Sequence, residues 1–255
     1  MESKLKQPKV AVIDLWKSFA DKEVLRGINL EVWPGESLVI VGSSGAGKSV
    51  LLKHFIGLIQ PDRGHVIVDG EDLTCAEPDK CLALRRKFGM AFQEGALFDS
   101  LNVFENVAFP LRRHTKMTEA EIAERVRFCL SLVHLKGVES KMPAELSGGM
   151  RRRVGFARAI VLAPDILLFD EPNTGLDPIT SAAIDKVIIE MRDEMPVTMV
   201  TITHHMHSAF RIADRIAMLK QGQIIAAAPP ETFRQLRDPY IQAFLAGRPL
   251  DEEAA

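Results

Sequence analysis

The segment Gly42-Ser-Ser-Gly-Ala-Gly-Lys-Ser49 decides the fold, because it fits the phosphate-loop pattern G-x-x-x-x-G-K-[ST]. Residues 37–41 before it are apolar and β-branched, which predicts a buried strand, and residues 50–56 after it predict the start of a helix. Strand, glycine-rich loop and helix in this order distinguish the motif from a chance glycine turn. The sequence therefore predicts a site for the phosphates of a nucleoside triphosphate.

Each residue type in this loop has a chemical role. Glycines let successive N–H groups point inward, and with the helix N-terminus these groups form a concave anion site. Lys48 is expected to reach the β- and γ-phosphates, and the Ser49 hydroxyl is expected to ligate Mg²⁺. The residues predicted to contact ATP here are Gly42, Ser43, Ser44, Gly45, Ala46, Gly47, Lys48, Ser49 and Val50.

Two carboxylates follow an apolar run at residues 166–169. If that run is a strand of a parallel sheet, Asp170 and Glu171 lie at its carboxyl end, where ligands bind in such sheets. Asp170 is then expected to hold Mg²⁺, directly or through water, and Glu171 to orient and polarise the attacking water. Without the phosphate loop, the same residues would more often be a strand that runs into a solvated loop.

The composition is that of an ordinary globular protein, with 255 residues, of which 47% are hydrophobic and 26% charged. The net charge of −2 predicts no nucleic-acid partner. Residues 1–9 lack the apolar region of a secretory signal, and no run of 18 apolar residues occurs, so we expect neither a signal peptide nor a bilayer-spanning segment.

Three cysteines and a group of three histidines are candidate metal ligands. The cysteines are odd in number and lack C-x-x-C spacing, so we expect small apolar fillers in a reducing cytoplasm rather than a disulfide or a zinc site. The histidines have no evident fourth ligand, and we expect turn and surface positions for two of them. The residues are Cys75, Cys81 and Cys129, and His204, His205 and His207.

The order of strand-like and helix-like segments predicts an α/β protein. The first forty residues indicate antiparallel β structure, residues 95–163 are mostly helical, and the later strands are separated by a helix at 178–194, which predicts parallel pairing. The expected strands are 10–15, 24–32, 37–41, 65–69, 88–92, 165–170, 197–203, 216–219 and 223–226.

The segment Leu146-Ser-Gly-Gly-Met150 opens a basic helix, and its N–H groups offer a second anion site. The phosphate loop, this segment, Asp170-Glu171 and a histidine after the next strand occur in the order seen in the ATPase subunits of ATP-binding cassette (ABC) transporters, which residues 8–230 resemble. The resemblance implies a P-loop NTPase of the ABC ATPase fold with an antiparallel β subdomain and a helical subdomain inserted at about 95–163. We expect a nucleotide-binding domain at 1–228 and a C-terminal extension at 229–255.

The resemblance also implies roles for single residues. Phe19 matches the aromatic residue that stacks on adenine, Gln93 the glutamine that senses Mg²⁺ and connects to the membrane partner, and His204 the histidine that contacts the γ-phosphate. Residues 173–177 match the loop that crosses the dimer. The segment Leu146-Ser-Gly-Gly-Met150 matches the signature segment of the family, in which Met150 replaces the usual glutamine.

The resemblance further implies a homodimer in which each ATP lies between the phosphate loop of one subunit and Ser147, Gly148 and Gly149 of the other. ATP binding closes such a dimer and hydrolysis releases it. The chain is thus expected to be an ATPase that drives a separate multi-span permease.

Four short sequence segments resemble the ATPases of MCE-type phospholipid transporters, the maintenance-of-lipid-asymmetry (Mla) systems of Gram-negative bacteria. These segments are residues 95–101, 146–150, 175–180 and 238–247. This implies phospholipid movement between inner and outer membranes, an MCE-domain protein and a small accessory subunit as further partners, and a peripheral place on the cytoplasmic face of the inner membrane, with membrane contact only through the permease. A small-solute ABC importer and a signalling ABC ATPase of cell division remain alternatives.

Two apolar groups have open interpretations. One either lines a groove for a permease helix or packs inside the helical insertion. The other is expected to pack on protein surface, either of this chain or of the second ATPase subunit. The first group is Phe98, Leu101, Phe104 and Phe109, and the second is Tyr240, Ile241, Phe244 and Leu245.

Overall fold

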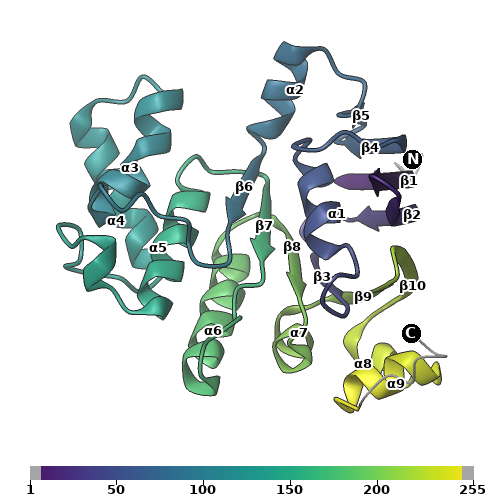
Figure 1. Ribbon diagram of the computed structural model, residues 1–255. Coiled ribbons are helices and arrows are strands. Elements are labelled where there is room, and N and C mark those ends of the chain that lie inside the picture. Colours follow the sequence, from purple (N-terminus) through teal and green to yellow (C-terminus); the bar gives the residue numbers. More distant parts are fainter. Residues whose placement is uncertain (1–6, 249–255) are drawn as a thin grey trace, which may run out of the picture. The chain divides into compact units, whose positions relative to one another are not determined.

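The computed structural model describes residues 7–248, and its chain divides into two compact units. Unit 1 comprises Met1–Arg86 and Ile202–Ala255, and unit 2 comprises Lys87–Thr201. Figure 1 labels the helices and strands of both units. Residues 1–6 and 249–255 lie outside the described part. Part of the N-terminal segment and part of the expected C-terminal extension therefore also lie outside it. The domain boundaries inferred from the sequence stay a prediction.

An antiparallel sheet of unit 1 has the strand order β2-β1-β4-β5 (Figure 1). Its strands are β1 (Val10–Phe19), β2 (Lys22–Val32), β4 (Arg63–Val68) and β5 (Glu71–Asp72). Strand β1 runs four residues beyond its predicted end, because register shifts after Val12 interrupt the apolar alternation by which a strand is recognised.

The phosphate loop lies between β3 (Ser37–Val41) and α1 (Lys48–Phe55). All five residues of β3 are buried, as a near-continuous apolar run predicts for a strand covered on both faces. Strand β3 pairs in parallel with β9 (Arg215–Lys220), and β10 (Gln223–Ala228) pairs antiparallel with β9. The sheet that carries the loop therefore contains both parallel and antiparallel neighbours.

Four further helices belong to unit 1, and the last of them holds the apolar residues of the tail. Tyr240 and Ile241 are buried, whereas Phe244 and Leu245 are half-buried. The Tyr240 hydroxyl lies 3.4 Å from Ser43 Oγ, so this part of the tail packs within the chain. The helices are α2 (Pro78–Arg85), α7 (Met206–Ile212), α8 (Pro230–Arg234) and α9 (Pro239–Leu245).

Unit 2 contains a parallel strand pair, β6 (Phe88–Ala91) and β7 (Ile166–Asp170). The helix α6 (Pro178–Glu194) leads from β7 to β8 (Thr198–Thr203), which lies beside β7 in the sheet order and contains the boundary between the units. Helix α6 spans the predicted residues, since Asp177 and Pro178 are strong helix-start signals.

The remaining helices of unit 2 are α3 (Val103–His114), α4 (Glu119–Leu132), the 3₁₀ turn η1 (Pro143–Glu145) and α5 (Gly148–Ile160). Helix α4 begins with a capping box between Thr118 and Glu121. The predicted α/β fold class is confirmed. Among residues 7–248, no helix is both long and apolar enough to cross a bilayer.

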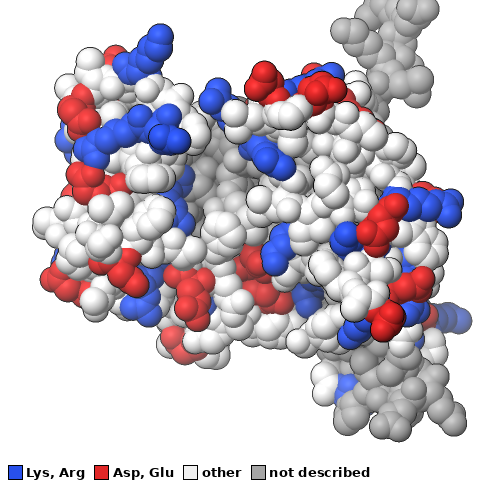
Figure 2. Space-filling view, turned by 45° about the horizontal axis from the view of Figure 1, so that its top comes forward, with Lys and Arg blue, Asp and Glu red and all other residues white. Residues whose placement is uncertain are grey.

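Charges are mixed on the face of the molecule that Figure 2 shows. Lysine and arginine side chains lie among aspartate and glutamate side chains there, rather than forming one extended patch of a single sign. This pattern agrees with the net charge of −2. The face in view therefore lacks the single-sign field that draws polyanions to a surface.

Candidate functional site

Two glycines give the phosphate loop its shape. Gly47 has a φ of 107° and caps α1, with no side-chain hydrogen bond at the cap. A Cβ on Gly42 would lie 2.3 Å from the carbonyl oxygen of Leu219. Because neither position accepts an ordinary side chain, the backbone itself forms the surface that faces a ligand.

The side chain of Lys48 is buried along this loop. Its Nζ donates to the carbonyl oxygens of Gly42, at 2.8 Å, and Ser43, at 3.1 Å. An ammonium group has three donors and no acceptor, so it can exchange such bonds for bonds to phosphate oxygens without leaving the loop. The chemistry of this amine and the positive end of α1 fit an anionic phosphate.

A hollow of about 400 Å³ opens beside the loop. Its walls come from Ser43–Ala46, from Lys22 and its neighbours on β2, and from the turn at Gln221 and Gly222. Gly222 joins these walls, because its carbonyl accepts from Arg26 N at 2.8 Å and its N–H donates to Ala46 O at 3.3 Å.

Phe19 lies at the end of the hairpin whose second strand lines this hollow. It pairs across the strands with Lys22, and its ring is 46% exposed. The structure therefore brings the hairpin that carries Phe19 and the phosphate loop to one hollow within unit 1. The exposed ring can take part in stacking.

His204 belongs to unit 1 and directly follows β8. Its side chain is exposed, and its ring centroid lies 4.3 Å from that of His205. The His205 N–H donates to Thr203 Oγ1 at 3.0 Å, which holds the turn. Neither histidine, nor His207, belongs to a group of metal-ligating side chains among residues 7–248.

The predicted carboxylates lie in unit 2, at the carboxyl end of β7. Asp170 is the last residue of the strand, and Glu171 has a φ of 47°. A positive φ is uncommon for a residue with a side chain and persists only where the surroundings enforce it. Thr174 is one such neighbour, since its Oγ1 donates to Glu171 Oε2 at 3.1 Å. Thr174 therefore orients the Glu171 carboxylate.

Arg152 connects two predicted segments of unit 2, although the sequence marked it only as part of a basic helix. Its side chain is buried, its Nε donates to Gln93 O at 2.7 Å, and its Nη2 donates to Thr174 O. Burial lowers the pKa of this guanidinium, which still carries its charge at neutral pH. Arg152 thus links the backbone at Gln93 to the residue that orients Glu171.

The signature segment opens α5 in a different way from the phosphate loop. Ser147 caps the helix, and its Oγ accepts from Met150 N at 3.3 Å. A Cβ on Gly149 would lie 2.8 Å from Thr180 Cγ2, whereas Gly148 has no neighbour closer than 3.7 Å. A Cβ on Gly148 would meet Leu176 Cδ2 at an ordinary van der Waals distance, so unit 2 leaves room there for a small side chain.

Residues 173–177 are tied to their own unit. Asn173 Nδ2 donates to Asp185 Oδ1 at 2.6 Å. Asp177 Oδ1 accepts from the N–H groups of Ile179 and Thr180, and bonds led by the Thr180 hydroxyl lower the pKa of Asp177. The aspartate expected at the dimer interface thus also begins α6.

The aromatic residues after Gln93 are divided between surface and interior. Phe98 and Phe109 are exposed, with ring centroids 5.0 Å apart, whereas Phe104 is half-buried. The buried Asn106 holds this segment, because its side chain accepts from Phe98 N and donates to the carbonyl of Leu101. An exposed pair of aromatic rings favours the groove interpretation for these two residues.

The expectation for the cysteines is wrong at one position. Cys81 and Cys129 are buried, but Cys75 is exposed. Cys75 lies in the bend after β5, where no apolar periodicity marks an inward-facing side. All three thiols are free.

The chain is similar to a known protein family, to named proteins and to solved structures. Residues 25–174 match the family model described as ABC transporter. The probable ribonucleotide transport ATP-binding protein mkl of Mycobacterium tuberculosis is 41% identical over 239 residues, which cover 94% of this chain and 67% of that protein. The intermembrane phospholipid transport system ATP-binding protein MlaF of Escherichia coli is 39% identical over 224 residues, covering 88% and 83%.

Solved structures extend this similarity to the fold. The dimeric structure of MJ0796, described as a bacterial ABC transporter cassette, superposes with a TM-score of 0.80 and 30% identity over 87% of this chain and 98% of that one. The same cassette has been solved in a post-hydrolysis state bound to ADP and Pi. A family model that covers more than half of the residues, and relatives this similar over most of the chain, show that the chain belongs to the ABC transporter family.

Proposed function

We propose that this ABC ATPase powers the movement of phospholipid between the inner and outer membranes of a Gram-negative bacterium. The chain is an ATPase of a transporter by its family. The observation that carries the finer proposal is its 39% identity with MlaF, whose name assigns it to intermembrane phospholipid transport. The short motifs after Gln93 and around Ser147 agree with this assignment.

ATP would bind at the phosphate loop, with its adenine on Phe19 and its phosphates on the N–H groups of residues 42–50. Lys48 would exchange its bonds to the Gly42 and Ser43 carbonyls for bonds to the β- and γ-phosphates. Mg²⁺, when bound, neutralises charge on these phosphates. The oxygen donors of Ser49, Asp170 and Gln93 have the chemistry that Mg²⁺ prefers.

Hydrolysis would depend on a water molecule that Glu171 orients and polarises. Thr174 donates to one oxygen of that carboxylate, which limits its rotation, and a carboxylate can act as the general base that accepts the proton of water. His204 would donate to the γ-phosphate. Gln93 would report the state of the site to the membrane partner, through the segment that Arg152 holds.

The proposed working unit is a homodimer that contacts the membrane only through a permease. Ser147, Gly148 and Gly149 of one chain would complete the nucleotide site of the other, and the solved relative MJ0796 is a dimer. The further partners would be a multi-span permease, an MCE-domain protein and a small accessory subunit. The complex would place this chain on the cytoplasmic face of the inner membrane.

A second candidate function is the import of a small solute. The relative mkl, at 41% identity, is named as a probable ribonucleotide transport protein. The nucleotide chemistry would be the same, because in both systems the substrate is held by other subunits.

The partners separate these two candidates. Purification of the full chain from membranes, with identification of the copurifying proteins by mass spectrometry, should yield a multi-span permease and an MCE-domain protein. A periplasmic solute-binding protein in their place would support the import of a small solute and contradict the phospholipid proposal.

The division of labour between the two carboxylates is tested by Glu171→Gln and Asp170→Asn. Glu171→Gln should retain Mg-ATP but hydrolyse it very slowly, because an amide does not polarise water as a carboxylate does. ATP should therefore trap a dimer of this variant, measured by size-exclusion chromatography. Asp170→Asn should instead weaken Mg²⁺-dependent nucleotide binding. Identical behaviour of the two variants would contradict these roles.

A further inference from the structure

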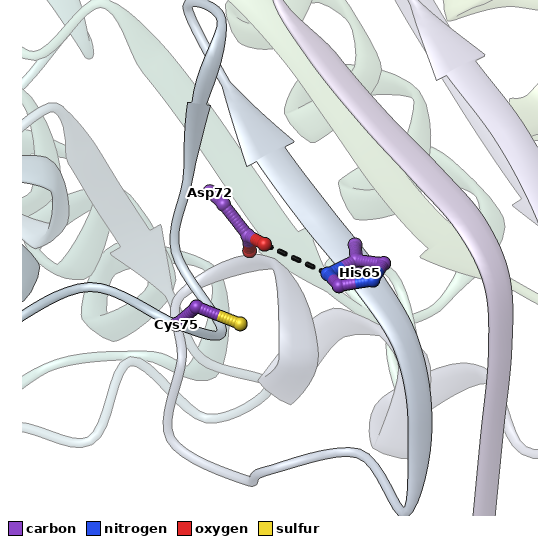
Figure 3. A group of neighbouring side chains, drawn as sticks. All are labelled: His65, Asp72 and Cys75. Carbon is purple, nitrogen blue, oxygen red and sulfur yellow. Dashed lines mark hydrogen bonds and ion pairs between the residues drawn. The ribbon is translucent and has the colours of Figure 1, made fainter.

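Three side chains with metal-ligating atoms meet on the β4–β5 hairpin, in unit 1 (Figure 3). His65 lies on β4, Asp72 is the last residue of β5, and Cys75 follows three residues later. Their ligand atoms all lie within 4.8 Å of one another, and His65 Nδ1 is 2.7 Å from Asp72 Oδ2. Imidazole, carboxylate and thiol converge here from segments that the hairpin brings together.

The backbone beneath this cluster is held by hydrogen bonds. Ile67 pairs with Asp72 and Val68 with Glu71, and Leu73 N donates to Val66 O at 2.8 Å. The turn between the strands, at residues 69–70, has positive φ at both positions, which is the tight hairpin turn that the Asp-Gly pair favours. His65 and Asp72 therefore project from a paired backbone, and Cys75 projects from the short bend that follows it.

Thr74 orients the carboxylate of Asp72. Its N–H and its Oγ1 both donate to Oδ1, at 2.9 and 2.5 Å, which turns Oδ2 toward His65. Burial is the largest single influence and raises the pKa of Asp72, but hydrogen bonds from Thr74 and His65 together bring this pKa below its usual range. Asp72 thus has one carboxylate oxygen already anchored by Thr74, as metal-ligating carboxylates commonly have.

We propose that His65 Nδ1, Asp72 Oδ2 and Cys75 Sγ bind one Zn²⁺ ion, with water as the fourth ligand. A nitrogen, an oxygen and a sulfur donor together suit Zn²⁺, whereas Ca²⁺ and Mg²⁺ prefer oxygen alone. Around a tetrahedral ion with ligand distances of about 2.0–2.3 Å, ligand atoms lie roughly 3.3–3.7 Å apart. The exposed side chains of His65 and Cys75 can reach this spacing by small rotations.

This site differs from the nucleotide site in both residues and chemistry. None of its three ligands is among the residues expected to contact ATP. It also replaces the expectation, drawn from cysteine spacing, that no cysteine binds zinc, because Cys75 reaches its partners across a hairpin rather than through a C-x-x-C motif. A bound ion would clamp the bend at residues 73–77 onto β4.

Cobalt(II) is the probe for this proposal, since it replaces Zn²⁺ and gives a sulfur-to-metal charge-transfer band only when a thiolate is bound. The tag-free full chain, without nucleotide and in excess Mg²⁺, should take up one Co²⁺ with this band, and Zn²⁺ should displace it. Burial raises the pKa of Cys129 to about 11, which keeps that thiol protonated. Cys81 and Cys129 are both buried, so the band is expected from the exposed Cys75, and Cys75→Ser tests this assignment.

Four variants locate the ligands. Cys75→Ser should abolish the band and His65→Ala should weaken Co²⁺ binding at least tenfold. Thr74→Val should weaken it roughly tenfold, because supporting hydrogen bonds of a ligand typically contribute ten- to a hundredfold. His114→Ala, at an exposed histidine of α3, is the matched control and should bind as the unaltered chain does.

Two outcomes would overturn the proposal. One is Co²⁺ uptake without a charge-transfer band, or no uptake at all, by the unaltered chain. The other is equal binding by the unaltered chain and Cys75→Ser. Circular dichroism of each variant should show an unchanged fold, since all three ligands lie at or near the surface. Cys75→His, which offers an imidazole in place of the thiol, should bind Co²⁺ without the band.

Discussion

Helices α1 and α5 both begin at a glycine-rich turn, yet the two turns are built differently. The turn before α1 ends in Gly47, in a left-handed conformation and without a side-chain cap. The turn before α5 ends in Ser147, whose hydroxyl accepts a backbone N–H of its own helix. The first is thus shaped by backbone alone, and the second is a conventional capped helix start.

The cations near the two turns differ in the same way. Lys48 lies within its loop and donates to two loop carbonyls, where an anion would compete for it. Two arginines of α5 instead donate to carbonyls elsewhere in unit 2, Arg152 to Gln93 and Arg158 to Gly95, whereas Arg151 donates to Leu146 at the start of the turn. A basic helix behind a glycine turn is therefore no evidence of an anion site unless its charges face the ligand.

The largest expected effect comes from removing the cation of the first turn. Lys48→Ala should lower ATP hydrolysis at least a hundredfold and weaken nucleotide binding, because a buried charge-assisted bond to phosphate is lost. Lys53→Ala, at an exposed lysine of the same helix, is the control and should keep its activity. Steady-state ATPase assays and nucleotide titrations measure both. Near-normal turnover of Lys48→Ala would remove the phosphate-loop assignment.

The sequence predicted the first turn well because its signals are local. The spacing of Gly42, Gly47 and Lys48, and the apolar run at 37–41, depend only on near neighbours in the chain, and β3 and α1 lie where they indicate. The capping box of α4 and the Asp-Gly hairpin turn follow the same logic. The α/β class was predictable for this reason.

Other parts depend on the conformation of a loop or on contacts between distant residues, which no recognised sequence pattern records. The left-handed backbone of Glu171 and its bond from Thr174 require the loop at 172–177 to fold back. The bond from Arg152 to Gln93 spans 59 residues. Cys75 was expected to be buried, but its exposure is set by the path of the bend after β5.

An intermediate effect is expected at Arg152, whose charge acts inside unit 2. Arg152→Met should lower kcat about tenfold with a small change in KM, because loss of its bonds loosens Gln93 and Thr174 without touching the nucleotide. A factor of ten corresponds to about 1.4 kcal/mol, close to the lower end of the roughly 1.5–3 kcal/mol typical of hydrogen bonds to charged groups.

Arg153→Met is the matched control for this prediction. Arg153 lies on the same helix, and its guanidinium also donates to backbone carbonyls, but those belong to Val133, His134 and Gly149 rather than to Gln93 and Thr174. A similar loss of stability in both variants, with reduced kcat only in Arg152→Met, would support a positioning role. Equal activity of the two variants would reduce Arg152 to a structural residue.

The most direct contrast between the two turns concerns their glycines, and it includes the smallest expected effect, that of Gly148→Ala. Gly47→Ala should destabilise the chain by about 1–3 kcal/mol. The alanine would have to keep the φ of 107° that Gly47 has, and its Cβ would lie 3.0 Å from Leu25 Cδ2. Gly148→Ala should instead stabilise the chain by about 0.4–1 kcal/mol, because alanine restricts the unfolded chain. The residue is helical, and the new Cβ would lie 3.7 Å from Leu176 Cδ2, an ordinary contact distance. Urea unfolding without nucleotide measures both changes.

If Gly148→Ala nevertheless loses ATPase activity, the absence of a side chain at Gly148 is needed for a ligand or partner chain rather than for folding. Stabilisation with full activity would contradict the proposal that this turn completes the nucleotide site of a second subunit.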